Sequence, residues 1–288
     1  MARASLATDG DTNVTNPAPE PQRERGKRPP HGDPVVDRAL SLLAAFDAGH
    51  RSLSLGELAR RSGIPTSSTL RLAGRLVAWG ALERGKDGRF TVGLRLWEVA
   101  SLAPRGHGLR QIAMPFMGDL EEVTRQHVLL AVRDGEEALL VERLSSYQAM
   151  PVLYRVGGRL PLHSTGVGLV LLAFAESAFQ ERVLAQPLVH EPEKVAVSPA
   201  ALRRTLAEVR REGLATIRRR APEPLVTVAA PIFGADDQIA AALSVVVPAE
   251  NAEPRLLGPA VRTAARSISR GLGARRSIGF ATGAAAAQ

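Results

Sequence analysis

Apolar residues in the first part of the chain recur at helical spacing in three short segments, which predict three successive helices. In the second segment Ser54 and Glu57 form a capping-box pattern, and Gly63 ends the helix. The third helix begins at Pro65 and ends at Gly80. The inward positions expected for the first helix are Val36, Leu40, Leu43 and Phe46, and for the third helix Thr69, Leu72, Leu76 and Trp79.

A β-hairpin is predicted directly after the third helix. Two short runs, 81–84 and 89–92, flank the turn sequence Gly85-Lys86-Asp87-Gly88. The pattern then becomes helical again at 94–107, a linking helix that we expect Pro104 to break. Residues 33–93 are therefore interpreted as one small domain of three helices and a wing, followed by a linker at 94–107.

The remaining segment, 108–273, alternates helical and strand patterns and predicts an α+β domain. Helices are expected around 112–123, 198–213 and 257–268. Strands are expected at 128–132 and 138–141 around the Asp134-Gly135 turn, with a third strand at 152–156. A second hairpin is expected at 226–232 and 239–247. The two ends, 1–32 and 274–288, contain few large apolar residues and are interpreted as disordered tails.

Charge is concentrated in the small N-terminal domain and its linker. Residues 33–107 hold eleven basic and seven acidic side chains, which is +4 of the net charge of +8. No acid occurs between Glu57 and Glu83. A basic face of this kind suits a polyanionic partner.

Other compositional features exclude several classes of protein. The absence of cysteine excludes disulfides, thiolate metal sites and a cysteine nucleophile. The six histidines show no metal-ligand spacing, and no motif indicates a cofactor. The start lacks the apolar core of a signal peptide and no apolar run is long enough to span a bilayer, so we expect a cytoplasmic protein without membrane contact.

The third helix carries the pattern of a DNA-recognition helix. A short capped helix joined to a longer one by Gly63-Ile64-Pro65 is typical of a helix-turn-helix, whose second helix enters the major groove. Hydroxyls near its start reach phosphates and base edges, and an arginine can make a forked contact to guanine. The candidate DNA-binding residues are Thr66, Ser67, Ser68, Arg71 and Arg75 on the helix and Arg84, Lys86 and Arg89 on the wing.

Three helices with surface arginines also occur in proteins that never bind DNA. One alternative is an enzyme or small-molecule-binding module whose helical head contacts other proteins. Another is an architectural DNA-binding protein without a ligand. The hairpin directly after the third helix favours DNA binding, because it completes a winged helix-turn-helix.

Several motifs in order along 34–273 resemble the IclR family of bacterial transcription regulators. They are Val35–Leu40, Leu55–Gly63, Ile64–Leu72, Arg159–Gly168 and Val228–Phe233. The resemblance implies a winged helix-turn-helix, a linker helix and a GAF-like α/β effector-binding domain. It further implies a homodimer or homotetramer.

The segment 160–168 also predicts a ligand site by itself. A strand leads to a Ser164/Thr165 cap and a helix opened by two glycines, whose backbone N–H groups favour a carboxylate. The resemblance likewise points to small organic acids, aromatic acids among them. The candidate effector-binding residues are Leu130, Tyr154, Leu162, His163, Ser164, Thr165, Gly166, Thr227, Ala229 and Ser244.

Some residues depart from the family pattern or invite another interpretation. Leu169 stands where many relatives have lysine, and Thr227 stands where many have cysteine. The arginine triplet 218–220 could attract an anionic effector, but the preferred interpretation is a solvated loop. His163 beside Ser164 suggests a catalytic pair, but adjacency does not aim a base at a nucleophile. We therefore expect no enzyme activity.

The prediction is a homo-oligomeric regulator that places two recognition helices on a pseudo-palindromic double-stranded DNA operator. An organic acid bound in the C-terminal domain would change operator affinity. Repression is the expected default, with activation open.

Overall fold

The computed structural model describes residues 34–47, 49–147, 149, 152, 154–190, 195–220 and 223–275. The chain divides into two compact units between Leu96 and Trp97, inside the predicted linker. Each unit has its own hydrophobic core and is described by itself. The predicted tails lie outside the described residues, except for Ala274 and Arg275.

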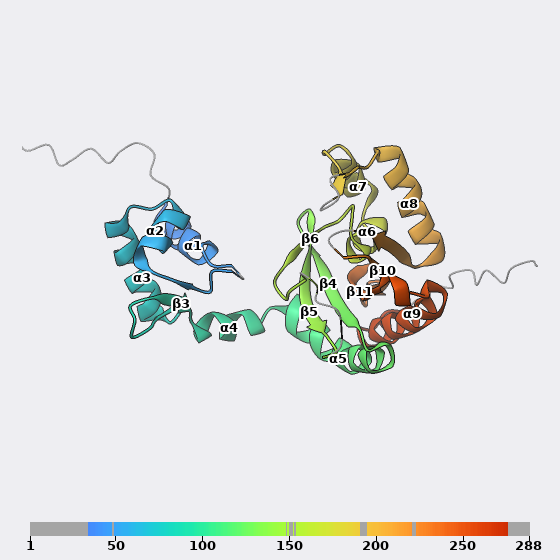
Figure 1. Ribbon diagram of the computed structural model, residues 1–288, viewed down its shortest axis with the longest axis horizontal. Helices are drawn as coiled ribbons and strands as arrows, with labels where there is room; N and C mark the ends of the chain where they lie inside the picture. Colours follow the sequence, from blue (N-terminus) through green and yellow to red (C-terminus); the bar gives the residue numbers. More distant parts are fainter. Residues whose placement is uncertain are drawn as a thin grey trace, which may run out of the picture. The chain divides into compact units, whose positions relative to one another are not determined.

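The first unit consists of three helices and a small antiparallel sheet (Figure 1). Its sheet order is β1-β3-β2, so the predicted hairpin is present and gains a third strand that the sequence pattern did not predict. The element after β3 is the linker helix α4. The elements are α1 (Val35–Ala44), β1 (Ser52–Leu53), α2 (Leu55–Ser62), α3 (Thr66–Trp79), β2 (Leu82–Arg84), β3 (Phe90–Val92) and α4 (Leu94–Ser101).

Local sequence signals set the ends of α2 and α3. The Ser54 hydroxyl accepts a hydrogen bond from the Glu57 N–H, and the Glu57 carboxylate accepts one from the Ser54 N–H, which completes the capping box. Gly63 and Gly80 end the two helices with positive φ angles of 70° and 88°. Glycine adopts this left-handed conformation at little cost, so both predicted ends are confirmed.

The predicted inward stripe of α1 was partly wrong. Val36 and Leu40 are 67% and 56% exposed, whereas Leu42 and Ala45 are buried. Leu43 and Phe46 pack at the edge of the core, as expected. The core therefore covers only the C-terminal part of α1.

The second unit is built on a six-stranded antiparallel sheet of order β6-β5-β4-β11-β10-β9. A separate two-stranded ribbon, β7–β8, lies outside it. The sheet strands are β4 (His127–Asp134), β5 (Glu137–Leu144), β6 (Arg159–Pro161), β9 (Ala215–Arg219), β10 (Leu225–Phe233) and β11 (Ile239–Pro248), and the ribbon is β7 (Val189–His190) with β8 (Val195–Ala196). The helices are α5 (Pro104–Thr124), α6 (Gly166–Ala173), α7 (Ser177–Leu184), α8 (Pro199–Glu212) and α9 (Pro254–Gly271), with a short 3₁₀ turn at Ala249–Asn251.

Helices cover both faces of this sheet (Figure 1). One core joins α6, α7 and α8 to one face, which we call the α6 face. The other joins α5 and α9 to the opposite face, which we call the α5/α9 face. Because side chains alternate along a strand, neighbouring residues such as Leu129 and Leu130 belong to different cores. The predicted α+β class is confirmed.

Three predictions at the level of elements were wrong. Among the described residues of 152–156 there is no strand, and β6 at Arg159–Pro161 pairs with β5 instead. The linking helix does not extend over 94–107: α4 ends at Ser101 and Pro104 begins α5, because the first turn of a helix needs no N–H from that residue. Arg218 and Arg219 belong to β9, the edge strand, and not to a loop.

No helix in the described ranges combines the length and apolarity that crossing a membrane would require.

Candidate functional site

The polar start of α3 faces outward. Thr66 and Ser67 are exposed and Ser68 is half-buried, whereas Thr69 is fully buried and donates its hydroxyl to the Ile64 carbonyl at 3.1 Å. Leu72 and Ala73 pack into the core below. Helical periodicity therefore separates a packed face from a free face on the same helix.

The free face is electropositive. Arg71 and Arg75 are exposed and, within the described part of the chain, make no hydrogen bond or ion pair. The first turn of α3 has no acid and no side-chain cap, so its N–H groups point outward without a protein acceptor. Such a helix start, followed by two free guanidinium groups, can bind phosphate and base edges.

The wing residues divide into two groups. Lys86, at the turn, is exposed, and Arg84 is exposed with its guanidinium 5.5 Å from the centre of the Phe90 ring. Arg89 is occupied within the unit, since it donates to the Ser52 carbonyl and the Glu57 carboxylate, each at 2.8 Å. Arg89 thus anchors the wing to the start of α2, a role that the sequence pattern did not indicate.

In the second unit the start of α6 is packed tightly against the sheet. The Thr165 hydroxyl accepts from the Gly168 N–H at 3.1 Å and donates to the Pro161 carbonyl at 2.8 Å. A Cβ on Gly168 would lie 2.4 Å from that carbonyl oxygen, and one on Gly166 would lie 2.6 Å from the Thr227 methyl carbon. Both glycines are required by this close approach.

Most of the other predicted effector residues gather on the same face of the sheet. Ala229 and Ser244 are paired neighbours on β10 and β11, and Thr227 lies two residues before Ala229. Leu162 and Ser164 are buried beside them in the turn before α6. The Ser244 hydroxyl is fully buried and has no hydrogen-bond partner. An unsatisfied buried hydroxyl is uncommon in folded proteins.

Leu130 does not lie with the other predicted effector residues. It lies in the core of the α5/α9 face, with Met117 and Leu243, on the side of the sheet opposite to α6. Its neighbour Leu129 lies on the α6 face and pairs directly with Ser244. A one-residue displacement along a strand reverses the face, and the sequence pattern of β4 is apolar on both sides.

His163 has a structural hydrogen bond. Its Nε2 is 2.8 Å from the Val189 carbonyl oxygen, which fixes the turn before α6 to β7. A ring N–H directed at a carbonyl is a donor and cannot serve as a base there.

Two arginines outside the predicted effector-binding set also lie on the α6 face. Arg219 Nη1 donates to the Tyr154 hydroxyl at 2.9 Å, and Arg143 Nη1 donates to the Tyr154 carbonyl oxygen. Tyr154, a predicted effector residue, packs against the core of this face. The alternation of side chains along β9 could have identified Arg219. It lies two residues after Ile217 and four after Ala215, and both of these residues face α6.

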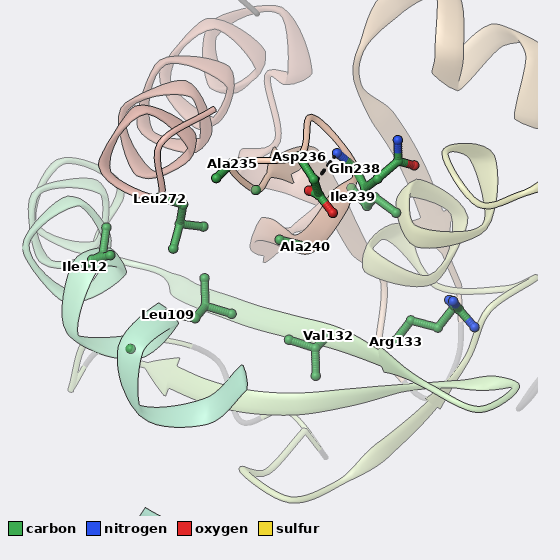
Figure 2. Close-up of a pocket in the computed structure, with 12 residues that line it drawn as sticks. Leu109, Ile112, Val132, Arg133, Ala235, Asp236, Gln238, Ile239, Ala240 and Leu272 are labelled. Carbon is green, nitrogen blue, oxygen red and sulfur yellow. Dashed lines mark hydrogen bonds between the residues drawn. The ribbon is translucent and has the colours of Figure 1, made fainter. Parts of the chain in front are cut away.

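A cavity of about 490 Å³ lies between the start of α5, the β10–β11 turn and the end of α9 (Figure 2). Leu109, Ile112 and Leu272 extend toward it, and the Asp236 carboxylate at its edge accepts from the Gln238 N–H at 3.0 Å. None of the predicted effector residues lines this cavity.

Comparison with known proteins matches both units. Residues 35–86 match the IclR helix-turn-helix domain, and residues 103–270 match the bacterial transcriptional regulator IclR C-terminal domain. The HTH-type transcriptional regulator BhcR of Paracoccus denitrificans is 29% identical over 250 residues, which cover 85% of this chain and 89% of BhcR. The transcriptional repressor IclR of Escherichia coli is 28% identical over 217 residues, which cover 74% of this chain and 79% of IclR.

A solved structure is also similar to most of the chain. An IclR homolog from Microbacterium hydrocarbonoxydans, complexed with 4-hydroxybenzoate, is 36% identical with a TM-score of 0.79, and the alignment covers 83% of this chain and 99% of that one. The two relatives of this chain described above are named as transcriptional regulators and not as enzymes. With a winged helix-turn-helix, an α/β C-terminal domain and matches over most of its length, the chain belongs to the IclR family of bacterial transcription regulators.

Proposed function

We propose that this regulator binds a double-stranded operator through α3 and the wing, and that a small organic acid bound on the α6 face changes its operator affinity. The outward, uncapped start of α3 with Arg71 and Arg75 free is the observation that supports operator binding most strongly. Repression is the proposed mode, because two of the relatives, IclR and AllR of E. coli, are named repressors.

The base-contacting set is Thr66, Ser67, Ser68, Arg71 and Arg75. Lys86 and Arg84 are proposed to contact backbone phosphate beside the groove, where a positive side chain adds affinity without sequence preference. Arg89 is assigned to the support of the wing, because its guanidinium is already hydrogen bonded to Ser52 and Glu57.

A homo-oligomer is supported by the linker helix. Within the described residues α4 buries none of its side chains, and Leu94 and Trp97 are 73% and 65% exposed. Apolar side chains in this number on one short helix favour burial against another chain. A second copy would also supply the second recognition helix that a palindromic operator needs.

The effector site is proposed on the α6 face, at the start of α6. The orphan hydroxyl of Ser244 supports a polar ligand there, and the helix start favours an anion. The relative complexed with 4-hydroxybenzoate supports an acid, aromatic acids included.

The test is capture of genomic fragments by the full-length protein, followed by a gel shift on the enriched sequence with and without added acids. Specific retention that resists unrelated competitor DNA, and that an acid alters, is expected. Retention that is equal for all sequences and disappears with moderate salt would instead indicate an architectural protein. No retention would indicate a binding module whose head contacts other proteins.

A further inference from the structure

Tyr154 is held at both ends by arginines from widely separated strands. Arg219 ends β9 at one edge of the sheet, and Arg143 lies in β5, with β4, β11 and β10 between them. Arg219 binds the hydroxyl of Tyr154, and Arg143 binds its carbonyl oxygen. Tyr154 therefore connects Arg143 and Arg219 across one face of the sheet.

Tyr154 and its two arginines lie on the same face of the sheet as the proposed effector site. Arg219 pairs with Leu225 and Arg143 pairs with Leu129, and both leucines belong to the core on the α6 face. Ser244 lies on the same face, since it pairs with Leu129 on one side and with Ala229 on the other. Tyr154 and the start of α6 therefore lie on the same face of the sheet.

The hydrogen bonding of Arg219 is incomplete. Its Nε is buried and has no partner, and Nη1 binds only a neutral phenol. In the described part of the chain, neither Arg219 nor Arg143 forms an ion pair with a carboxylate. A guanidinium fork binds a carboxylate through two parallel N–H groups, and this charge-assisted pairing is stronger than a bond to a neutral hydroxyl.

We propose that Arg219 recognises the carboxylate of the effector, which replaces the Tyr154 hydroxyl on this guanidinium. This inference rests on the effector site proposed above and adds its specificity-determining residue. Arg143 keeps hold of the Tyr154 backbone, so the ring stays near the ligand after the hydroxyl has been displaced. A cavity of about 180 Å³ adjoins Tyr154, Leu140 and Leu160.

The effector class that follows is a small monocarboxylic acid with an apolar body. The carboxylate would meet Arg219, and the body would lie on apolar residues of the α6 face such as Leu129 and Ile217. The matching primary amide has nearly the same shape but lacks the charge, and two of its N–H atoms would face the arginine donors. Acid and amide should therefore be strongly discriminated.

The test is calorimetric and thermal-shift titration of the full chain with benzoate, 4-hydroxybenzoate and hexanoate and with the amide of each. The two aromatic probes and the aliphatic one distinguish which apolar body fits. At least one acid is expected to bind and its amide to fail. Arg219→Gln should weaken that acid by roughly tenfold or more, because a hydrogen-bonded charge pair is lost.

Matched variants separate recognition from a merely structural role. Arg218→Gln removes the same charge from the exposed neighbouring position of β9 and should leave acid affinity unchanged. Tyr154→Phe removes the competing hydroxyl and should tighten acid binding, whereas a purely structural Tyr154 would give weaker binding. The melting temperature of Arg219→Lys without ligand is measured alongside its acid affinity. It shows whether a loss of affinity is caused by a loss of folding.

The inference is overturned if no acid binds, if amides bind as well as acids, or if Arg219→Gln binds the acid like the unaltered chain. Operator retention of the unaltered chain, measured in parallel, keeps the two proposals apart. If the unaltered chain binds its operator specifically but acid binding does not depend on Arg219, only the role assigned to Arg219 is wrong. If the unaltered chain shows no specific operator binding, the proposed function itself is wrong.

Discussion

The guanidinium of Arg89 lies 2.8 Å from the carboxylate of Glu57, which joins the wing to the capping box of α2 across 32 residues of sequence. The same carboxylate accepts from the Ser54 N–H at 2.8 Å. One acidic side chain therefore holds both the first turn of the helix-turn-helix and the position of the wing.

This double role predicts acid sensitivity of the wing. The Ser54 N–H and hydroxyl, and then Arg89, hold the pKa of Glu57 below its ordinary value of 4.5. A lowered folded-state pKa means that this stabilisation is complete above pH 4.5 and is lost as the pH falls through the folded-state value. The protection of the amides at 82–92, measured as the exchange rate relative to the intrinsic rate at the same pH, should therefore fall below about pH 4.5.

Glu57→Gln is the matched variant for that experiment. It keeps the shape but cannot titrate, so its wing should exchange faster at neutral pH and show a weaker additional change in acid. Equal pH dependence in the two proteins would contradict the role assigned to Glu57.

Arg71→Ala is expected to weaken operator binding by about 1–3 kcal/mol, because a forked contact to a base is removed. The melting temperature should not change, since Arg71 is exposed and makes no contact in the described part of the chain. Gel shift on the captured operator measures the effect. Arg204→Ala on α8 removes the same charge from the other unit and should leave affinity as it was; equal losses in both variants would point to net charge alone.

Gly168→Ala is expected to destabilise the second unit by about 1–3 kcal/mol, as overpacking against rigid backbone does. The added Cβ would meet the Pro161 oxygen at 2.4 Å. Gly118→Ala in α5, where nothing lies within 4 Å of the added carbon, should be neutral or stabilising by about 0.5–1 kcal/mol. Denaturant unfolding of both variants makes the comparison.

Ser244→Ala should have opposite effects on stability and on ligand binding. Removing a buried hydroxyl that has no partner is expected to leave the unliganded chain equally stable or more stable by about 1 kcal/mol. Acid affinity should fall, because the ligand loses a polar contact. A marked loss of stability without ligand would show that the hydroxyl is satisfied in the native protein.

Leu130 and Leu129 provide a test of the two faces. Either change to Ala should cost about 2–5 kcal/mol of stability, since both side chains are buried. Only Leu129→Ala should alter acid affinity, because only Leu129 lies on the α6 face. Titration under conditions where both variants remain folded decides the matter, and an effect of Leu130→Ala as large as that of Leu129→Ala would argue against the location of the site.

The sequence by itself determined the features that depend on neighbouring residues. The Ser54 capping box, the glycine ends of α2 and α3, the hairpin around Gly85–Gly88 and the cap at Thr165 arise from local backbone preferences and short-range hydrogen bonds. For the same reason the outward start of α3 could be predicted, since helical periodicity places Thr69 and Leu72 opposite to Arg71.

The tertiary structure decided what depends on residues distant in sequence. Strand pairing put Leu130 on the face opposite to the other effector candidates, and only the fold brought Arg89 to Glu57 and Arg219 to Tyr154. No local pattern carries that information. A strand that is apolar on both faces does not reveal which face each side chain is on. The sequence around an arginine likewise does not show whether its guanidinium contacts solvent, a carboxylate or a phenol.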